Sequence, residues 1–180
     1  MNNRKLSMDE LNRLTVEQYK NLKKIPIVVV LDNIRSMHNV GSFYRTADAF
    51  AITAIYLCGI TATPPNKEIH KTALGSTETV DWKYFEKTID AVNDLKANGF
   101  EVFAVEQVAN PVLLHEHQWD AQTPIALVFG NEVFGVDDEV IKFCKGCIEI
   151  PQMGTKHSLN VSVSGGIVLW NLVRKYLTNS

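Results

Sequence analysis

The sequence predicts an α/β fold in which helices cover both faces of a parallel β-sheet. Short runs of β-branched and apolar residues recur along the chain, as at residues 27–31 and 125–129. Such uninterrupted runs are typical of parallel strands that are buried on both faces. Helical segments separate these runs, and a regular alternation of strand and helix favours parallel pairing in one sheet. The composition of the 180 residues, 46% hydrophobic and 21% charged, is that of an ordinary globular domain.

The N-terminal part of the chain predicts a helical extension over residues 1–25, ahead of the main domain at 26–180. Two capping-box patterns, S-x-x-E at 7–10 and T-x-x-Q at 15–18, each mark a helix start. We therefore expect two short helices in this extension. Pro26 ends the segment, because the residue before a proline is disfavoured in helical conformation.

The expected elements alternate from the first strand onward. A strand over residues 27–31 is followed by a polar loop over 32–41 and a helix over 41–50. Gly99 lies directly behind an amphipathic segment, where glycine commonly ends a helix. In chain order, the other expected elements are a strand over 54–58, a short helix over 68–74, a short strand over 79–84, a helix over 87–98, a strand over 100–105, a short helix within a loop at 109–122, a strand over 125–129, a helix over 137–143 and a strand over 147–150.

The last expected helix, at about 161–177, has two unusual properties. It is apolar on more than one face, which indicates burial on all sides, and a partner chain is one available cover for so small a domain. It also contains Gly165 and Gly166, although each glycine inside a helix costs about 1 kcal/mol relative to alanine. Another segment must therefore lie close to its backbone. Asn160 or Ser158 can cap its first turn, because both side chains carry an oxygen that accepts backbone amides.

Charge distribution and the absence of export signals narrow the class of protein. The net charge is −2, but residues 1–24 carry six Lys or Arg against three acidic residues, and the remainder carries twelve against seventeen. The N-terminal segment thus has a local charge of +3 and the remainder of the chain a charge of −5. A basic segment of this kind fits either contact with phosphates or a solvated helix face. No apolar run approaches the roughly 20 residues of a membrane span, and no signal-peptide core precedes the domain, so we expect a cytoplasmic protein.

Cysteine and histidine residues predict neither disulfides nor a metal site. Three cysteines are an odd number, and the pair Cys144 and Cys147 fits packing better than redox chemistry. His115 and His117 lie in a loop without a third ligand, which is insufficient for zinc.

Polar residues that packing does not explain gather where three strands end. They form the patterns N-x-G-x-x-x-R at 39–45, G-N-E-x-x-G at 130–135 and S-x-N at 158–160. The carboxyl ends of parallel strands meet at one edge of a sheet, which is where such sheets bind ligands. Glycines in these loops let the backbone approach a ligand closely. The nucleotide patterns GxGxxG after the first strand and GxxxxGK[ST] anywhere are missing, which weakens NAD and ATP as ligands.

Taken together and in this order, the three loops resemble the motifs of the SpoU/TrmH family of RNA ribose 2′-O-methyltransferases, of the SPOUT class. The likeness covers about residues 26–177. Its most specific part is I-P-Q-M-G-x-x-x-S-L-N-V-S at 150–162, and K-T-A-L-G at 71–75 resembles the family's intervening loop. The resemblance implies a deep C-terminal trefoil knot, which no spacing rule would predict, S-adenosylmethionine bound on the knot loops, and a homodimer with active sites at the subunit interface. Threading of the backbone through a loop would also explain Gly165 and Gly166.

The resemblance further implies the residues of the site. The catalytic positions are Arg45, Asn39, Glu132, Ser158 and Asn160, and the cofactor-binding positions are Val105, Phe129, Gly130, Ile150, Met153 and Leu159. A guanidinium has a pKa above about 12 and is a poor base. We therefore expect Arg45 to grip an RNA phosphate and to stabilise negative charge on the ribose oxygen. The proton then leaves through that phosphate or through water.

The RNA substrate is expected to be structured, with an accessible nucleotide, and to be tRNA rather than rRNA. The family's separate N-terminal RNA-binding domain has no counterpart in these residues, so the basic segment at 1–25 and Lys67, Lys71 and Lys156 are the expected RNA contacts. No membrane or metal is expected to take part. Two alternatives stay open, a non-catalytic RNA-binding knotted dimer and an ordinary nucleotide-binding α/β enzyme.

Overall fold

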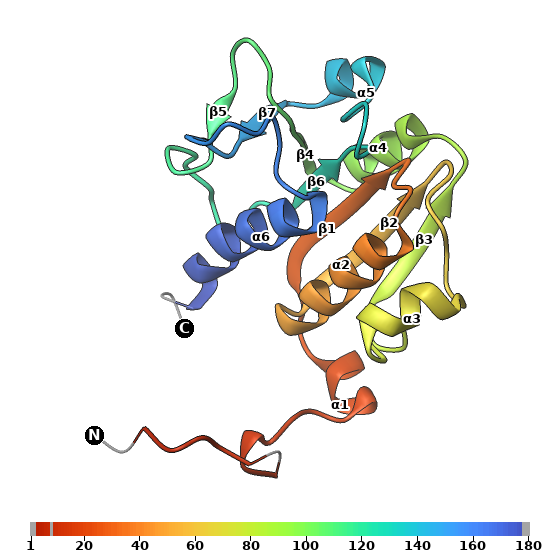
Figure 1. The fold of residues 1–180 in the computed structure, drawn as a ribbon, viewed down its shortest axis with the longest axis vertical. Coiled ribbons are helices and arrows are strands. Elements are labelled where there is room, and N and C mark those ends of the chain that lie inside the picture. Colours follow the sequence, from red (N-terminus) through yellow and green to blue (C-terminus); the bar gives the residue numbers. More distant parts are fainter. Residues whose placement is uncertain (1–2, 8, 178–180) are drawn as a thin grey trace.

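The structure, a computed structural model, describes residues 3–7 and 9–177 and has α/β architecture (Figure 1). Within these residues, seven parallel strands form one sheet in the order β3-β2-β1-β6-β4-β7-β5. The strands are β1 (Ile25–Asp32), β2 (Ile52–Cys58), β3 (Asp81–Phe85), β4 (Glu101–Val105), β5 (Val112–Leu113), β6 (Ile125–Phe129) and β7 (Gly146–Glu149). The helices are α1 (Val16–Asn21), α2 (Met37–Ala49), α3 (Lys67–Ala73), α4 (Thr88–Ala97), α5 (Asp138–Phe143) and α6 (Val161–Leu177). Among the described residues, no helix combines the length and apolarity needed to cross a membrane.

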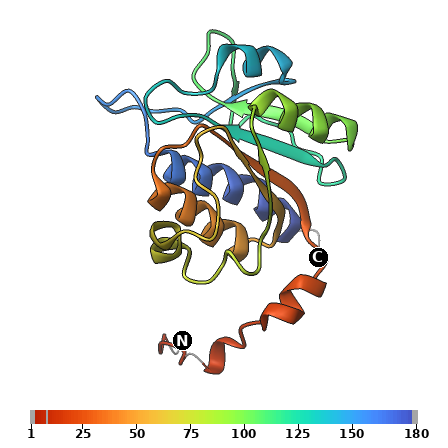
Figure 2. The same cartoon turned by 90° about the vertical axis from the view of Figure 1, so that its right-hand side faces the viewer.

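Two apolar cores lie on opposite faces of the sheet. Side chains alternate along β1, so that Val29 and Leu31 belong to one core and Val28 and Val30 to the other. Helices α2, α3 and α6 cover the first face, and α4 and α5 cover the second, as Figure 2 shows. Cover on both sides explains why every residue of β6 is buried. The predicted parallel sheet flanked by helices is confirmed.

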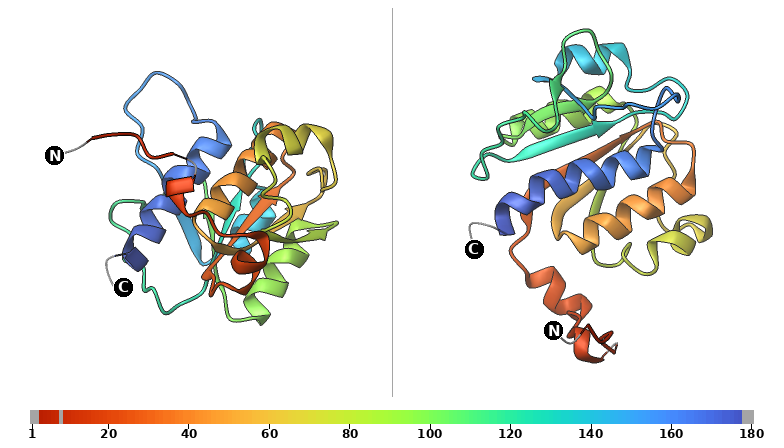
Figure 3. Two further views of the ribbon diagram at one scale, coloured as in Figure 1. Left: turned by 90° about the horizontal axis from the view of Figure 1, so that it is seen from below. Right: turned by 60° about the vertical axis from the view of Figure 1, so that its left-hand side comes forward.

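The N-terminal segment contains both predicted capping boxes. The Ser7 amide donates to Glu10 Oε2 (2.7 Å), and an equivalent pair begins α1. A short 3-10 helix at Asp9–Leu11 and α1 are the two expected helices. Tyr19 anchors the segment, because its side chain is buried and its hydroxyl donates to the Ala47 carbonyl (3.4 Å). The chain before it extends away from the sheet (Figures 1 and 3).

Helix α2 begins earlier than predicted, so the polar loop expected over 32–41 is partly wrong. The Ser36 hydroxyl accepts the Asn39 amide (3.2 Å) and caps the helix, which starts at Met37. Gly41 therefore lies inside a helix and does not begin one. A Cβ at this position would overlap the backbone and a side chain of α3, so glycine is required here for close helix packing.

The segment at 109–122 differs most from expectation. It contains β5, which pairs with β7 at the edge of the sheet, and the described structure has no helix there. A strand of two residues has no periodic pattern from which a sequence could reveal it. The boundaries of the other elements agree with the prediction to within two residues, except at the start of α2.

Helix α6 lies beside α2 on the first face of the sheet (Figure 3). A Cβ on Gly165 would overlap the ring of Phe43 from α2, whereas a Cβ on Gly166 would meet nothing within 4 Å. The expected close approach is therefore confirmed at Gly165 and wrong at Gly166. Its cause is the packing of an aromatic ring; no threaded backbone is needed to explain it.

Candidate functional site

A cavity of about 530 Å³ opens where β4, β6 and β7 reach their carboxyl ends. This position and volume are those expected of a small-molecule site in a parallel α/β protein. Five of the six predicted cofactor-binding residues line it, namely Val105, Phe129, Gly130, Ile150 and Leu159. Met153 does not, because its side chain points into solvent and is fully exposed.

Two glycines shape the cavity wall after β6. Asn131 and Gly135 pair through two backbone hydrogen bonds of 2.9 and 2.8 Å and close the loop between them. A Cβ on Gly130 would overlap the backbone of this closing pair. Gly135 has a φ of +72°, which favours glycine, and a Cβ there would overlap the carboxylate of Glu106. The two glycines thus allow a compact loop, and the atoms that lie close to them belong to neighbouring residues of the protein.

Asn39 joins the three predicted motifs. Its Nδ2 donates to Glu132 Oε1 (3.0 Å) in the loop after β6. Its Oδ1 accepts from Asn160 Nδ2 (3.2 Å) and lies 3.4 Å from the Ser162 hydroxyl, which donates to Asn160 Oδ1 (2.7 Å) at the start of α6. Glu132 and Asn160 are 93 and 121 residues away along the chain. We call this set of contacts the Asn39 junction.

Glu132 holds the start of α2 against the cavity wall. Its carboxylate accepts the backbone amides of Arg35 and Ser36, each at 3.0 Å, in addition to the Asn39 side chain. Partial burial acts to raise the pKa of Glu132, but these hydrogen bonds outweigh it and keep the pKa below its usual value. The carboxylate is therefore ionised at neutral pH, and its negative charge at a helix N-terminus is favourable.

The loop at 151–160 is exposed along its whole length. Gln107 Nε2 donates to the His157 carbonyl (2.8 Å) and ties the loop to the end of β4. At the end of the loop, Asn160 Oδ1 accepts the Ser162 amide (2.9 Å) and caps α6. Of the two predicted capping residues, Asn160 is thus the one that acts.

The predicted catalytic residues do not all reach the cavity within one chain. Glu132, Ser158 and Asn160 line it, and Asn39 lies behind two of them. Arg45 is exposed on α2 and is not part of the cavity wall. Within the described residues, neither Arg45 nor Ser158 forms a side-chain hydrogen bond or ion pair.

Three residues with a structural role in the site were given no role from the sequence, although Asn131 and Ser162 lie within its motifs. Gln107 and Ser162 make the contacts described above, and Asn131 Nδ2 donates to the Asn33 carbonyl (2.7 Å), which joins the loops after β6 and β1. The available signal was position, since Gln107 and Asn131 each lie two residues beyond the last residue of a strand.

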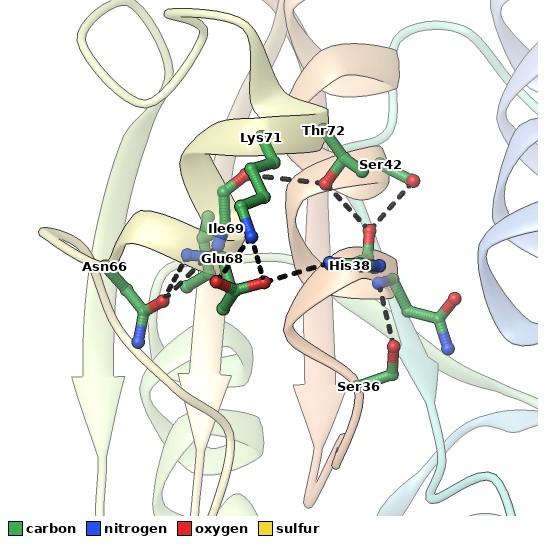
Figure 4. Close-up of polar contacts among 9 residues, drawn as sticks. Ser36, His38, Ser42, Asn66, Glu68, Ile69, Lys71 and Thr72 are labelled. Carbon is green, nitrogen blue, oxygen red and sulfur yellow. Dashed lines mark hydrogen bonds and ion pairs between the residues drawn. The ribbon is translucent and has the colours of Figure 1, made fainter.

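Helix α3 is fixed to α2 beside the site, as Figure 4 shows. The Thr72 hydroxyl donates to the His38 carbonyl (3.0 Å), and Glu68 Oε2 lies 3.3 Å from His38 Nε2. Lys71 Nζ lies 2.7 Å from Glu68 Oε1, and these two partners lower the pKa of Glu68. Arg45 follows His38 by about two turns of α2, on the same exposed side of the helix.

The three cysteines are free thiols. Burial raises the pKa of Cys58 and of Cys144 to about 12. Because the thiolate is the reactive form, these thiols are unreactive at neutral pH. In the part of the chain that the structure describes, no group of three or more His, Cys, Asp or Glu could hold a metal ion.

The fold is that of RNA methyltransferases of known structure. It matches the AdoMet-bound rRNA methyltransferase from Sinorhizobium meliloti with a TM-score of 0.78 and 28% identity, over 88% of this chain and 60% of that chain. The chain belongs to the SpoU rRNA Methylase family, whose model matches residues 26–170. The resemblance drawn from the three loops is confirmed.

Two relatives are named for different RNAs. The 23S rRNA (guanosine-2′-O-)-methyltransferase RlmB of Neisseria meningitidis is 32% identical over 150 residues, which cover 83% of this chain and 59% of that enzyme. The tRNA (guanosine(18)-2′-O)-methyltransferase of Thermus thermophilus is 29% identical over 168 residues, which cover 93% of this chain and 84% of that enzyme. The chain thus spans little more than half of the first relative, and the family alone does not determine the RNA.

Proposed function

We propose that this chain transfers a methyl group from S-adenosylmethionine to a ribose 2′-hydroxyl of structured RNA. The Asn39 junction is the observation that carries the proposal, because it draws three polar motifs together beside a cavity of about 530 Å³. Membership of the SpoU rRNA Methylase family supports the same reaction. We place the reaction in the cytoplasm, where such RNA is found.

The chemistry of the cavity wall fits S-adenosylmethionine. The apolar side chains of Val105, Ile148 and Ile150 suit an adenine ring, and the carboxylates of Glu106 and Glu149 suit a positively charged ligand. S-adenosylmethionine, when bound, supplies an electrophilic methyl group on a sulfonium. The residues of the chain need only hold the donor and bring the ribose oxygen to within about 3 Å, in line with that methyl.

The polar residues around the cavity take the positioning roles. Glu132 and Asn39 fix the start of α2, and Asn160 fixes the start of α6. The Ser158 hydroxyl, which lines the cavity without a protein partner among the described residues, orients the ribose. Arg45 grips a neighbouring phosphate and stabilises negative charge that develops on the ribose oxygen, and the proton leaves through that phosphate or water.

A second copy of the chain supplies Arg45 to the cavity in this proposal. Helix α6 has one exposed apolar stripe at helical spacing, although its sequence predicted burial all round. The stripe consists of Val163, Ile167, Trp170 and Leu177, with exposed fractions of 51%, 39%, 51% and 61%. Trp170 packs on Phe50, the residue that caps the C-terminus of α2, with ring centroids 6.0 Å apart. A copy that covers the stripe would therefore lie beside the helix that carries Arg45.

Subunit complementation tests this arrangement. Arg45→Ala removes the guanidinium, and Ile150→Glu places a charge in the apolar wall of the cavity. Each homodimer should be inactive, and an equimolar mixture should recover about a quarter of the wild-type sites, because half the dimers are mixed and each has one intact site. A mixture that is as inactive as its components, with dimers verified by sedimentation, would show that Arg45 acts within its own chain.

Calorimetry and methyl transfer test the function itself. We expect S-adenosylmethionine and S-adenosylhomocysteine to bind while NAD and ATP do not, and tritium to pass from the labelled donor to RNA. Binding of NAD or ATP without either methyl-donor compound would contradict the proposal. Binding of the donor without any transfer would support the non-catalytic knotted dimer.

The identity of the RNA and the knot are the finer parts of the proposal. We favour tRNA, supported by the 84% coverage of the Thermus tRNA enzyme. Mass spectrometry of tRNA and rRNA from a deletion strain should find one 2′-O-methyl group missing from tRNA, and a loss from rRNA alone would contradict this choice.

The family likeness also supports a trefoil knot, and an experimental structure with an unthreaded C-terminal segment would refute it. Residues 1–25 act as a separate extension that contacts RNA.

A further inference from the structure

Two aromatic rings at the rim of the cavity are exposed. Phe134, in the loop after β6, exposes 86% of its surface, whereas Phe129 within the same wall exposes 1%. The imidazole of His157, in the loop after β7, is the second exposed ring that lines the cavity. A large apolar side chain gains stability from burial. An exposed aromatic ring at the mouth of a binding cavity is available to stack on whatever enters the cavity.

The backbone that carries Phe134 is fixed. Asn131 Oδ1 accepts the amides of Val133 (2.9 Å) and Phe134 (3.3 Å), so one side chain holds the tip of the loop. The same asparagine donates to the Asn33 carbonyl (2.7 Å), and the pairing of Asn131 with Gly135 closes the loop. The exposure of the ring thus results from a well-held loop that presents it to solvent.

Methylation of a ribose places a nucleobase at this rim. The 2′-hydroxyl must enter the mouth of the cavity, and the base is bonded to the neighbouring C1′ carbon, so it lies beside the mouth. A nucleotide whose ribose enters a cavity has left its stack, and proteins hold such bases on aromatic side chains. The rim also carries the polar side chains of Glu132, Gln107 and His157, which can hydrogen-bond to the sugar and the edges of a base, beside the exposed apolar side chains of Val133 and Leu159.

We propose that the ring of Phe134 stacks on the base of the nucleotide to be methylated and so holds its ribose at the cavity mouth. This inference rests on the proposed function. His157, whose carbonyl is held by Gln107, offers a second ring to the same base. Stacking accepts any base, so Phe134 sets how firmly the nucleotide is held, while sequence preference comes from other contacts.

The test compares Phe134→Ala and Phe134→Trp with Val133→Ala, a matched control in the same loop with 62% of its surface exposed. Total RNA from a strain that lacks the gene is the substrate, and a short single-stranded RNA with 2-aminopurine reports stacking by its fluorescence. Phe134→Ala should lower kcat/KM and RNA affinity about 5- to 150-fold, the range of one base–aromatic contact. The Trp variant and Val133→Ala should stay near wild type, and S-adenosylmethionine affinity should not change.

Three results would overturn the inference. The first is an unchanged kcat/KM in Phe134→Ala. The second is an unchanged 2-aminopurine signal in that variant. The third is full rescue by Phe134→Leu together with dissociation of Phe134→Ala into monomers, because the ring would then pack against a second copy. A wild type that neither binds S-adenosylmethionine nor methylates RNA would instead refute the proposed function, and the fluorescence comparison would still decide whether Phe134 stacks on bases.

Discussion

Replacing Glu132 with glutamine would test how the site is held together, because it keeps the shape of the side chain and removes its charge. The carboxylate accepts three hydrogen bonds, from the Arg35 and Ser36 amides and the Asn39 side chain. In glutamine one oxygen becomes an NH₂ group, so at least one of these donors loses its acceptor. Since the side chain is only partly buried, we take about 0.5–1 kcal/mol for that bond and about 0.3–1 kcal/mol for the charge at the start of α2. The free energy of unfolding should fall by about 1–2 kcal/mol, which lowers Tm by about 2–8 °C.

The effect of this substitution should depend on pH in one direction. The pKa of Glu132 is lowered in the folded protein, so the unfolded chain binds a proton more readily. The stabilisation is therefore fully present above the ordinary glutamate pKa of about 4.3 and is lost as the pH falls through the lowered folded-state value. The difference in stability between wild type and Glu132→Gln should be constant near pH 7 and should shrink at acidic pH.

Urea unfolding at several pH values, at one protein concentration, measures this difference. Glu86→Gln is the matched control, because Glu86 is also exposed and its side chain forms no hydrogen bond or ion pair with the described residues. Methyl transfer should also slow in Glu132→Gln, since Asn39 loses a partner. A stability difference that is absent at pH 7, or that persists undiminished in acid, would refute the role assigned to the Glu132 carboxylate.

Three further predictions concern other parts of the chain. Arg45→Ala should reduce methyl transfer about 100-fold or more while S-adenosylmethionine affinity stays within a few-fold, and loss of donor binding at unchanged rate would contradict its role. Gly166→Ala should stabilise the protein by up to about 1 kcal/mol, because alanine favours the helix more than glycine does. Gly165→Ala should be about 1–3 kcal/mol less stable than Gly166→Ala, because its added Cβ overlaps the ring of Phe43. Equal unfolding curves for the two variants would argue against close packing of Phe43 on Gly165. Deletion of residues 1–24 removes a local +3 and should flatten the salt dependence of RNA binding without affecting S-adenosylmethionine, and an unchanged slope would make the segment purely structural.

The parts of the fold that sequence predicted well are those with a strong local signal. The strand β6 and the helix α6 were placed with their observed bounds, because an uninterrupted apolar run and a long apolar helix have few alternative interpretations. The capping residues Thr15 and Asn160 were predicted for the same reason, because their local sequence patterns are strong. The start of α2 was missed, because a glycine such as Gly41 commonly marks a helix boundary. Its actual cause, close packing against α3, cannot be read from the sequence.

The site was predicted from motif order, and its internal geometry was not. Position at the strand ends correctly suggested that loops after β1, β6 and β7 would meet, since this follows from parallel topology. No local pattern indicates that Asn39 would lie between Glu132 and Asn160, because that depends on which side chains face inward after folding. The separation of Arg45 from the cavity wall is likewise a property of helix orientation, which a motif does not specify.

The Asn39 junction also completes the cavity wall late as the protein is made, because Asn160 is one of the lining residues. Its partners are 93 and 121 residues distant, and contacts across such long segments form late because a large loop must first be closed. A nascent chain that has completed β7 already contains every strand of the sheet, but it still lacks Asn160 and the helix that Asn160 caps. Binding of the methyl donor is therefore expected only after α6 has been made, and a chain truncated before Asn160 should bind the donor weakly.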